Sequence, residues 1–138
     1  MQVYRNEAKG ITVSTGAIGY IPVKNRAGTD TFVFTYSNVS KKFQGKYGPR
    51  STAGDYANIG AARENGSRGG VTLAYEQPLH RKFSLVGDWL SGKNRFGYVA
   101  PGFIYTPTAK SLIGASYIIG NEGRGNNGLY VFFGYTFN

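Results

Sequence analysis

The sequence contains no cysteine, which excludes disulfide scaffolds, thiol nucleophiles and Cys-based zinc sites. Histidine occurs once, at His80, and proline only 5 times in 138 residues. No window approaches 18 consecutive apolar residues, so the sequence predicts no transmembrane helix. No glycine-rich stretch has the strand–turn–helix setting of a phosphate-binding loop. The sequence therefore indicates no cofactor and no metal site.

Glycine and aromatic residues are abundant, with 21 Gly, 11 Tyr, 9 Phe and one Trp. This mixture favours strands joined by turns over helices. The length fits a single domain over residues 1–138. A net charge of +9 indicates anionic partners, such as lipid A phosphates, nucleic acid or anionic polymers.

The carboxyl-terminal stretch is the most hydrophobic strand-like segment of the chain. Every second residue of this stretch is apolar or aromatic, so that one face of a strand would be wholly apolar or aromatic: Leu129, Val131, Phe133, Tyr135 and Phe137. A period of two is the periodicity of a strand, because successive side chains leave a pleated backbone on opposite sides. Such a strand needs partners for its edges and an apolar medium against one face, and a closed barrel in lipid supplies both.

The same alternation recurs along the chain and becomes regular from Asp55 onward. Glycine, proline and asparagine punctuate it at turns, with Asn65-Gly66 as a hairpin signal. Eight strands are predicted in this way, over Gly10–Tyr20, Thr29–Val39, Asp55–Glu64, Val71–Glu76, Phe83–Trp89, Phe96–Tyr105, Ile113–Ile119 and Leu129–Phe137. The sequence thus predicts an all-β, antiparallel, up-and-down transmembrane β-barrel of about eight strands.

Two segments do not follow the alternation. Residues 1–9 are polar and mixed in charge, and they carry no predicted element. Residues 40–54 contain four basic residues with glycines and a proline, and they are predicted to be an irregular basic loop, with a short extra strand as the alternative.

The chain resembles a small Gram-negative outer-membrane β-barrel of the eight-stranded type. The resemblance rests on the terminal strand, with Phe137 near its end and the apolar residues at every second place before it; Asn138 departs from the pattern, in which the aromatic residue is last. It covers residues 55–138, and the carboxyl-terminal part of a larger barrel is the alternative. The resemblance implies a terminal strand that signals to the barrel-insertion machinery and pairs with the first strand, here Gly10–Tyr20. It also implies a location in the bacterial outer membrane.

Polar and charged residues give the remaining candidate sites. Glu76 and Asp88 lie on the polar faces of neighbouring predicted strands, and we expect them to face the barrel interior and hydrogen-bond there. Basic residues in the predicted outer loops form a rim that is a candidate contact for lipopolysaccharide phosphates: Lys24, Arg26, Arg68, Lys93, Arg95 and Arg124. The alternative for this rim is ordinary solvation of loops.

No enzymatic activity is expected, because His80 lies in a predicted turn beside Arg81 and no predicted strand supplies a partner base. A barrel of about eight strands has an interior that side chains mostly fill. A structural envelope component or a narrow pore is therefore expected, with membrane lipids and lipopolysaccharide as partners and a homo- or hetero-oligomer left open.

A soluble basic β-protein that binds nucleic acid or anionic polysaccharide is the rival interpretation. It is favoured by the net charge and by residues 1–9, which lack the basic start and apolar run of a secretory signal peptide. It is opposed by the number of strands with an apolar face, all of which a soluble sandwich of this size would have to bury. On that ground the barrel is the preferred hypothesis, and nucleic acid is not expected as a partner.

Overall fold

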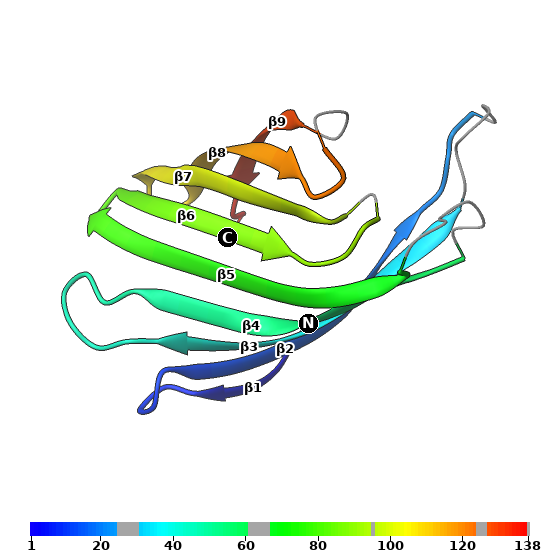
Figure 1. The fold of residues 1–138 in the computed structure, drawn as a ribbon. Coiled ribbons are helices and arrows are strands. Elements are labelled where there is room, and N and C mark those ends of the chain that lie inside the picture. Colours follow the sequence, from blue (N-terminus) through cyan, green and yellow to red (C-terminus); the bar gives the residue numbers. More distant parts are fainter. Residues whose placement is uncertain (25–30, 61–66, 95, 124–126, 138) are drawn as a thin grey trace.

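The computed structural model describes residues 1–24, 31–60, 67–94, 96–123 and 127–137. These residues form nine strands in one sheet (Figure 1). The strands are β1 (Gln2–Asn6), β2 (Ile11–Tyr20), β3 (Phe32–Lys42), β4 (Arg50–Ile59), β5 (Gly69–His80), β6 (Phe83–Leu90), β7 (Tyr98–Thr108), β8 (Ser111–Gly120) and β9 (Gly128–Tyr135). In the described part of the chain, no helix is long and apolar enough to cross a membrane.

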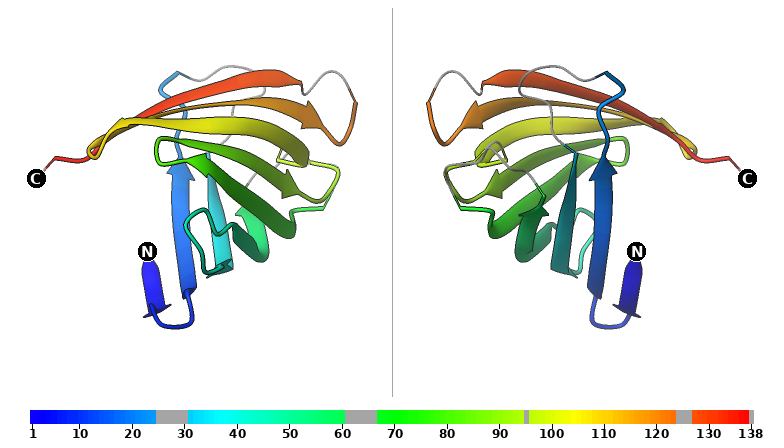
Figure 2. Two further views of the ribbon diagram at one scale, coloured as in Figure 1. Left: turned by 90° about the vertical axis from the view of Figure 1, so that its left-hand side faces the viewer. Right: turned by 90° about the vertical axis from the view of Figure 1, so that its right-hand side faces the viewer.

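Each strand pairs antiparallel with the next one in the chain, so the sheet is an up-and-down meander. The all-β, antiparallel, up-and-down order expected from the sequence is confirmed. Within the described residues, backbone pairing joins only consecutive strands, and β1 and β9 are the edges of an open sheet. Figure 2 shows how strongly this sheet bends, with β7–β9 lying across the top and β1–β4 descending below them.

The amino-terminal segment differs from the expectation. Residues 1–9 were given no element, yet Gln2–Asn6 form β1, which raises the number of strands from eight to nine. Strand β1 pairs with Ile11–Ser14 of β2. It therefore occupies part of the β2 edge with which the terminal strand is expected to pair in a closed barrel. The strand is short and exposed, and its pairing contains an irregularity between Gln2 and Tyr4.

The prediction for residues 40–54 is also corrected. Residues 40–42 end β3 and residues 50–54 belong to β4, so the loop is confined to 43–49. Lys42 lies opposite Arg50 in the ladder of β3 and β4. Both cations are exposed, because they lie at strand ends where a long side chain reaches water. A high local charge therefore did not prevent pairing.

The connections divide into two kinds at opposite ends of the sheet. One end, called the turn end, carries the connections 7–10, 43–49, 81–82 and 109–110. The other, called the loop end, carries the connections 21–31, 60–68, 91–97 and 121–127. The two connections 81–82 and 109–110 are tight because β5 and β7 run beyond the limits expected from the sequence. The turn-end connection 43–49 is longer and has the same length as the loop-end connections 91–97 and 121–127.

Alternation gives the sheet two different faces. The inner face holds the buried residues of the strands, including Phe32, Tyr56, Asn58, Ala100 and Ser116. The large side chains of the outer face are mostly exposed.

Two aromatic rings of the inner face cover glycines on the neighbouring strand. Tyr36 lies over Gly16 and Phe132 over Gly114, each pair directly opposite in the ladder. A side chain at either glycine would collide with the ring, so glycine allows the ring to lie flat on the sheet.

Candidate functional site

The outer face of β5–β9 is an exposed apolar surface without a charged residue in its middle. Phe133 is 66% exposed and Trp89 is 39% exposed. The other large members of this surface are Val71, Leu73, Tyr75, Leu85, Val99, Phe103, Tyr105, Ile113, Tyr117, Ile119, Leu129, Val131, Tyr135 and Phe137. Soluble monomers rarely expose an apolar patch that runs across five neighbouring strands. We call it the apolar outer surface.

Aromatic residues mark both margins of the apolar outer surface. Phe83 and Tyr105 face each other beside the turns at 81–82 and 109–110, and Tyr135 lies opposite the first residue of β8. Trp89 lies one residue before the end of β6, at the loop end. Aliphatic residues such as Leu85 and Val131 lie between these positions, together with the aromatic residues Phe103 and Phe133.

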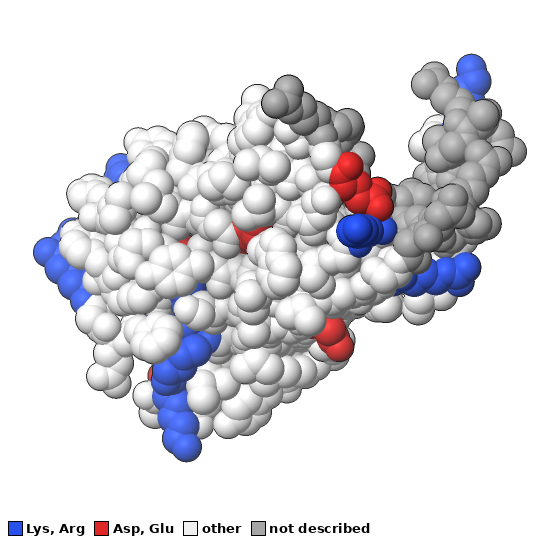
Figure 3. All heavy atoms as spheres, viewed as in Figure 1, with Lys and Arg blue, Asp and Glu red and all other residues white. Residues whose placement is uncertain are grey.

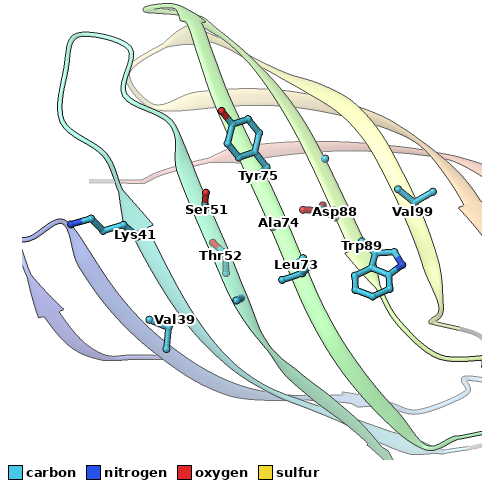
Figure 4. A pocket seen from close by; sticks show the side chains of 12 residues that line it. Val39, Lys41, Ser51, Thr52, Leu73, Ala74, Tyr75, Asp88, Trp89 and Val99 are labelled. Atoms are coloured by element: carbon cyan, nitrogen blue, oxygen red, sulfur yellow. The ribbon is translucent and has the colours of Figure 1, made fainter.

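A hollow of about 570 Å³ extends across the sheet from Val39 of β3 to Val99 of β7 (Figure 4), and Gly87 is among its lining residues. A side chain at Gly87 would touch nothing within 4 Å, because the hollow is open above it. Leu73, Tyr75, Trp89 and Val99 line its side on the apolar outer surface, and Lys41 and Ser51 line its side on β3 and β4.

The outer face of β2–β4 is different, because a polar row crosses it. Thr15, Ser37 and Asp55 are neighbours in the two ladders, and all three are exposed. The Thr15 hydroxyl donates a hydrogen bond to the Tyr36 carbonyl at 2.9 Å and lies 3.4 Å from the Ser37 hydroxyl. We call Thr15, Ser37 and Asp55 the polar outer row.

On the inner face, the loop end is filled by aromatic rings. Tyr20 stacks on Phe32 with 4.5 Å between ring centroids, and Phe34 stacks on Tyr56 at 5.4 Å. Phe96, from the connection between β6 and β7, contacts Phe32 at 5.6 Å and Phe34 at 5.1 Å. We call these five residues the aromatic cluster. It ties β2–β4 to the second half of the sheet.

A buried polar network lies beside the aromatic cluster. The Tyr56 hydroxyl donates a hydrogen bond to the Ser91 carbonyl at 2.5 Å. The Asn94 amide donates to the Tyr56 hydroxyl at 2.9 Å and to the Ser67 carbonyl at 2.8 Å. This network was not predicted from the sequence. The polar residues around Gly92 in the segment 91–95 were the only indication of it.

Charged and polar residues line a cavity toward the middle of the inner face. The expected interior residues Glu76 and Asp88 both lie on the inner face, half-buried, and both line a cavity of about 220 Å³ together with Arg50 and Tyr130. Glu76 lies directly opposite Arg50 in the ladder. Neither carboxylate makes a hydrogen bond or ion pair to a described residue, in contrast to the hydrogen bonding expected from the sequence; the only ion pair among those residues joins Arg5 to Glu7.

Basic residues gather at both ends of the sheet and leave its middle almost free of charge (Figure 3). Three members of the expected basic rim, Lys24, Arg68 and Lys93, are exposed and lie at the loop end. Arg26, Arg95 and Arg124 fall outside the described residues. The turn end carries a second group of basic residues, which the sequence did not predict as a group: Arg5, Lys9, Lys41, Lys42, Lys46, Arg50, Arg81, Lys82 and Lys110.

The terminal strand is present as β9, and Leu129, Val131, Phe133 and Tyr135 share its outer face. Phe137 lies beyond the end of β9 and is 87% exposed. Its neighbour in the sheet is β8. The expected pairing with β2 is not formed among the described residues, because β9 is an edge strand and β1 occupies part of the β2 edge.

His80 is exposed at the end of β5, where its Nδ1 lies 3.4 Å from the backbone nitrogen of Lys82. The described residues contain no group of three or more His, Asp or Glu residues that would hold a metal ion. Comparisons with protein-family models, with curated proteins and with solved structures found no match to this chain. The geometry of the two faces therefore carries the functional argument.

Proposed function

We propose that this chain is an integral outer-membrane β-barrel protein that serves as a structural envelope component or a narrow pore. In this proposal the apolar outer surface faces lipid hydrocarbon and the inner face lines the barrel. We assign the chain no catalytic role. Its partners are membrane lipids, lipopolysaccharide and the barrel-insertion machinery, with the outward residues of β9 and Phe137 as the insertion signal.

The apolar outer surface is the observation that carries the proposal. Five neighbouring strands expose aliphatic and aromatic residues along the whole outer face, and an outward apolar band of this kind is typical of transmembrane strands. The area is too large to be left in water by a soluble monomer. A hydrocarbon medium removes this cost without requiring a second layer of protein.

Closure of the ring belongs to the same proposal. Strands β2 and β9 run antiparallel, since seven intervening steps of antiparallel pairing separate them. A β2–β9 ladder would complete an eight-stranded barrel, as bacterial barrels have an even number of strands. It requires β1 to release Ile11–Ser14. The irregular pairing of β1 is consistent with such a release.

The loop end provides the proposed contact with lipopolysaccharide. Lys24, Arg68 and Lys93 are exposed cations there, and cations form charge-assisted hydrogen bonds with phosphate groups. The aromatic cluster fills the same end on the inner side, which favours a structural role or a very narrow pore over free diffusion of solutes.

A heat-modifiability experiment tests the proposal. The chain is folded in nonionic detergent, its β-type circular dichroism is recorded, and its mobility in SDS gels is compared before and after boiling. A barrel is expected to migrate differently in the two samples. A chain that stays monodisperse in buffer without detergent would refute the membrane assignment.

The rival function is a soluble β-protein that binds nucleic acid or anionic polysaccharide. The polar outer row and the basic groups at both ends favour it, because they give exposed polar surface to β2–β4 and cations for an anionic backbone. Saturable binding of single-stranded DNA or heparin by detergent-free monomer would support this rival.

A further inference from the structure

We propose that the turn end of the inner face binds a small phosphate-bearing anion between β1, β3 and β4. The site is a groove of about 500 Å³ lined by the cations Arg5, Lys42 and Arg50, by the hydroxyls of Thr12, Ser14 and Ser40, and by Gln2, Asn6, Glu7 and Gly10. We call it the turn-end groove. It lies on the inner face. Its β1 residues line it only while β1 pairs with β2, whereas Lys42 and Arg50 keep their places if β1 releases β2 to close the ring.

The opposed cations Lys42 and Arg50 are the main reason for an anion. They face each other directly in the ladder of β3 and β4, and like charges in that position destabilise a sheet. Neither side chain makes an ion pair or a hydrogen bond to a described residue. An anion between the two cations would convert their repulsion into two charge-assisted contacts.

The remaining charges leave the groove positive. Glu7 is the only acid in its lining, and its carboxylate lies 3.2 Å from the Arg5 guanidinium. Glu76 lies on the other side of Arg50, opposite it in the ladder of β4 and β5, and lines a separate cavity. Glu76 therefore competes with the bound anion for the Arg50 side chain, and substituting Glu76 gives a second test of the proposal.

The turn between β1 and β2 shapes the groove. Gly10 has a φ of +63°, and a side chain there would collide with the Lys42 carbonyl oxygen. Glycine therefore allows this turn to pack closely against the end of β3 and brings β1 over the groove. The Ser40 hydroxyl, 2.8 Å from the Thr52 hydroxyl, is held beside the two cations.

Dimensions and donor chemistry favour phosphate. The cations of β1 and β3 are separated by two strand spacings, about 10 Å, so a ligand with more than one phosphate group can reach both. Guanidinium, ammonium and hydroxyl groups are all donors to phosphate oxygens. A free polyphosphate and a phospholipid headgroup share this chemistry.

Isothermal titration of the full chain in nonionic detergent with inorganic pyrophosphate tests the site. Saturable binding is expected, with affinity reduced about tenfold by Lys42→Gln and by Arg50→Gln, the usual loss for a charge-assisted contact. Glu76→Gln is expected to increase the affinity, since it removes the competitor for Arg50. Lys93→Gln, at the loop end, is the matched control and leaves the affinity unchanged.

Two further arms keep the result clear. Lys42→Arg retains the charge and is expected to retain binding, which separates loss of the site from loss of the fold; circular dichroism is recorded for every variant. Micelles containing phosphatidylglycerol are compared with micelles of phosphatidylcholine. If only the former compete with pyrophosphate, the phosphate group comes from a lipid headgroup.

Absence of saturable binding, or an equal loss of pyrophosphate affinity in Lys42→Gln and Lys93→Gln, overturns the proposal. A detergent-free, soluble chain that still binds pyrophosphate refutes only the membrane assignment.

Discussion

The two halves of the sheet place their aromatic residues on opposite faces. In β2–β4 the large rings point inward, where Phe32, Phe34 and Tyr56 pack with Phe96. In β5–β9 most rings point outward, as Trp89 and the outer residues of β7 and β9 do. The two halves therefore differ in where their apolar area lies: the first half packs its rings into a small core, and the second half leaves most of its rings on the exposed outer face.

Polar residues distinguish the two halves on the outer face. Thr15, Ser37 and Asp55 cross the outer face of β2–β4, whereas the outer face of β5–β9 is apolar in its middle. The inner face carries polar residues in both halves, such as Asn58 in β4 and Glu76 in β5. The environment of each half can be changed separately by substitution, and the effects are expected to differ in size.

Removing a ring from the aromatic cluster is expected to have the largest effect. Phe34→Ala deletes contacts with Tyr56 and Phe96 and leaves a void between the two halves. The free energy of unfolding should fall by about 3 kcal/mol, as measured by urea titration in detergent. Phe34→Leu, which keeps most of the volume, is the control. A loss below about 1 kcal/mol for Phe34→Ala would mean that the cluster does not hold the halves together.

A charge introduced on the outer face is expected to have different effects in the two halves. Phe103→Arg places a cation in the apolar outer surface and should reduce the free energy of folding into phosphatidylcholine vesicles by about 2–4 kcal/mol. Ser37→Arg places the same charge in the polar outer row, next to Asp55, and should change it by less than about 1 kcal/mol. Phe103→Ala measures the part that is due to lost packing on Phe83. Equal losses in the two Arg variants would show that both halves face the same medium.

The sequence predicted the meander from β5 onward because strand period, turn residues and apolar alternation agree there. It did not predict β1, since the polar residues 2–6 become a strand only by pairing with β2. It misjudged residues 40–54 because the lysines and arginines suggested a loop, whereas position in the ladder shows that Lys42 and Arg50 end two paired strands.

The candidate sites were predictable to different degrees. Alternation alone placed the outer residues of β9 on one face, and it placed Glu76 and Asp88 on the inner face. The aromatic cluster and the turn-end groove were not predictable, because both join residues from segments far apart in the chain. Phe96 reaches Phe34 through the path of the connection 91–97, and Lys42 comes opposite Arg50 through the register of the β3–β4 hairpin; alternation predicts neither.

The buried network of the first half is expected to respond moderately to loss of one hydroxyl. Tyr56→Phe removes the hydrogen bonds to the Ser91 carbonyl and to the Asn94 amide in a buried site. The free energy of unfolding should fall by about 1–2 kcal/mol. Tyr75→Phe is the matched control from the outer face, because its hydroxyl makes one exposed hydrogen bond, to the Gln77 side chain. An equal effect of the two substitutions would contradict the contrast between an inward and an outward ring.

Neutralising Asp55 is expected to have the smallest effect and to test the polar outer row most directly. If the outer face of β2–β4 is hydrated, as its three exposed polar residues indicate, Asp55→Asn changes the free energy of folding into vesicles by no more than about 0.5 kcal/mol. A carboxylate held against hydrocarbon is costly, so in that case the same substitution would stabilise the folded protein well beyond this value. Ala115→Asp in β8 calibrates the measurement, since it adds a carboxylate to the apolar outer surface and should cost more than about 1 kcal/mol. If Asp55→Asn stabilises the protein by as much as Ala115→Asp destabilises it, the outer face of β2–β4 also meets an apolar medium. If Asp55→Asn changes nothing, only the outer face of β5–β9 does.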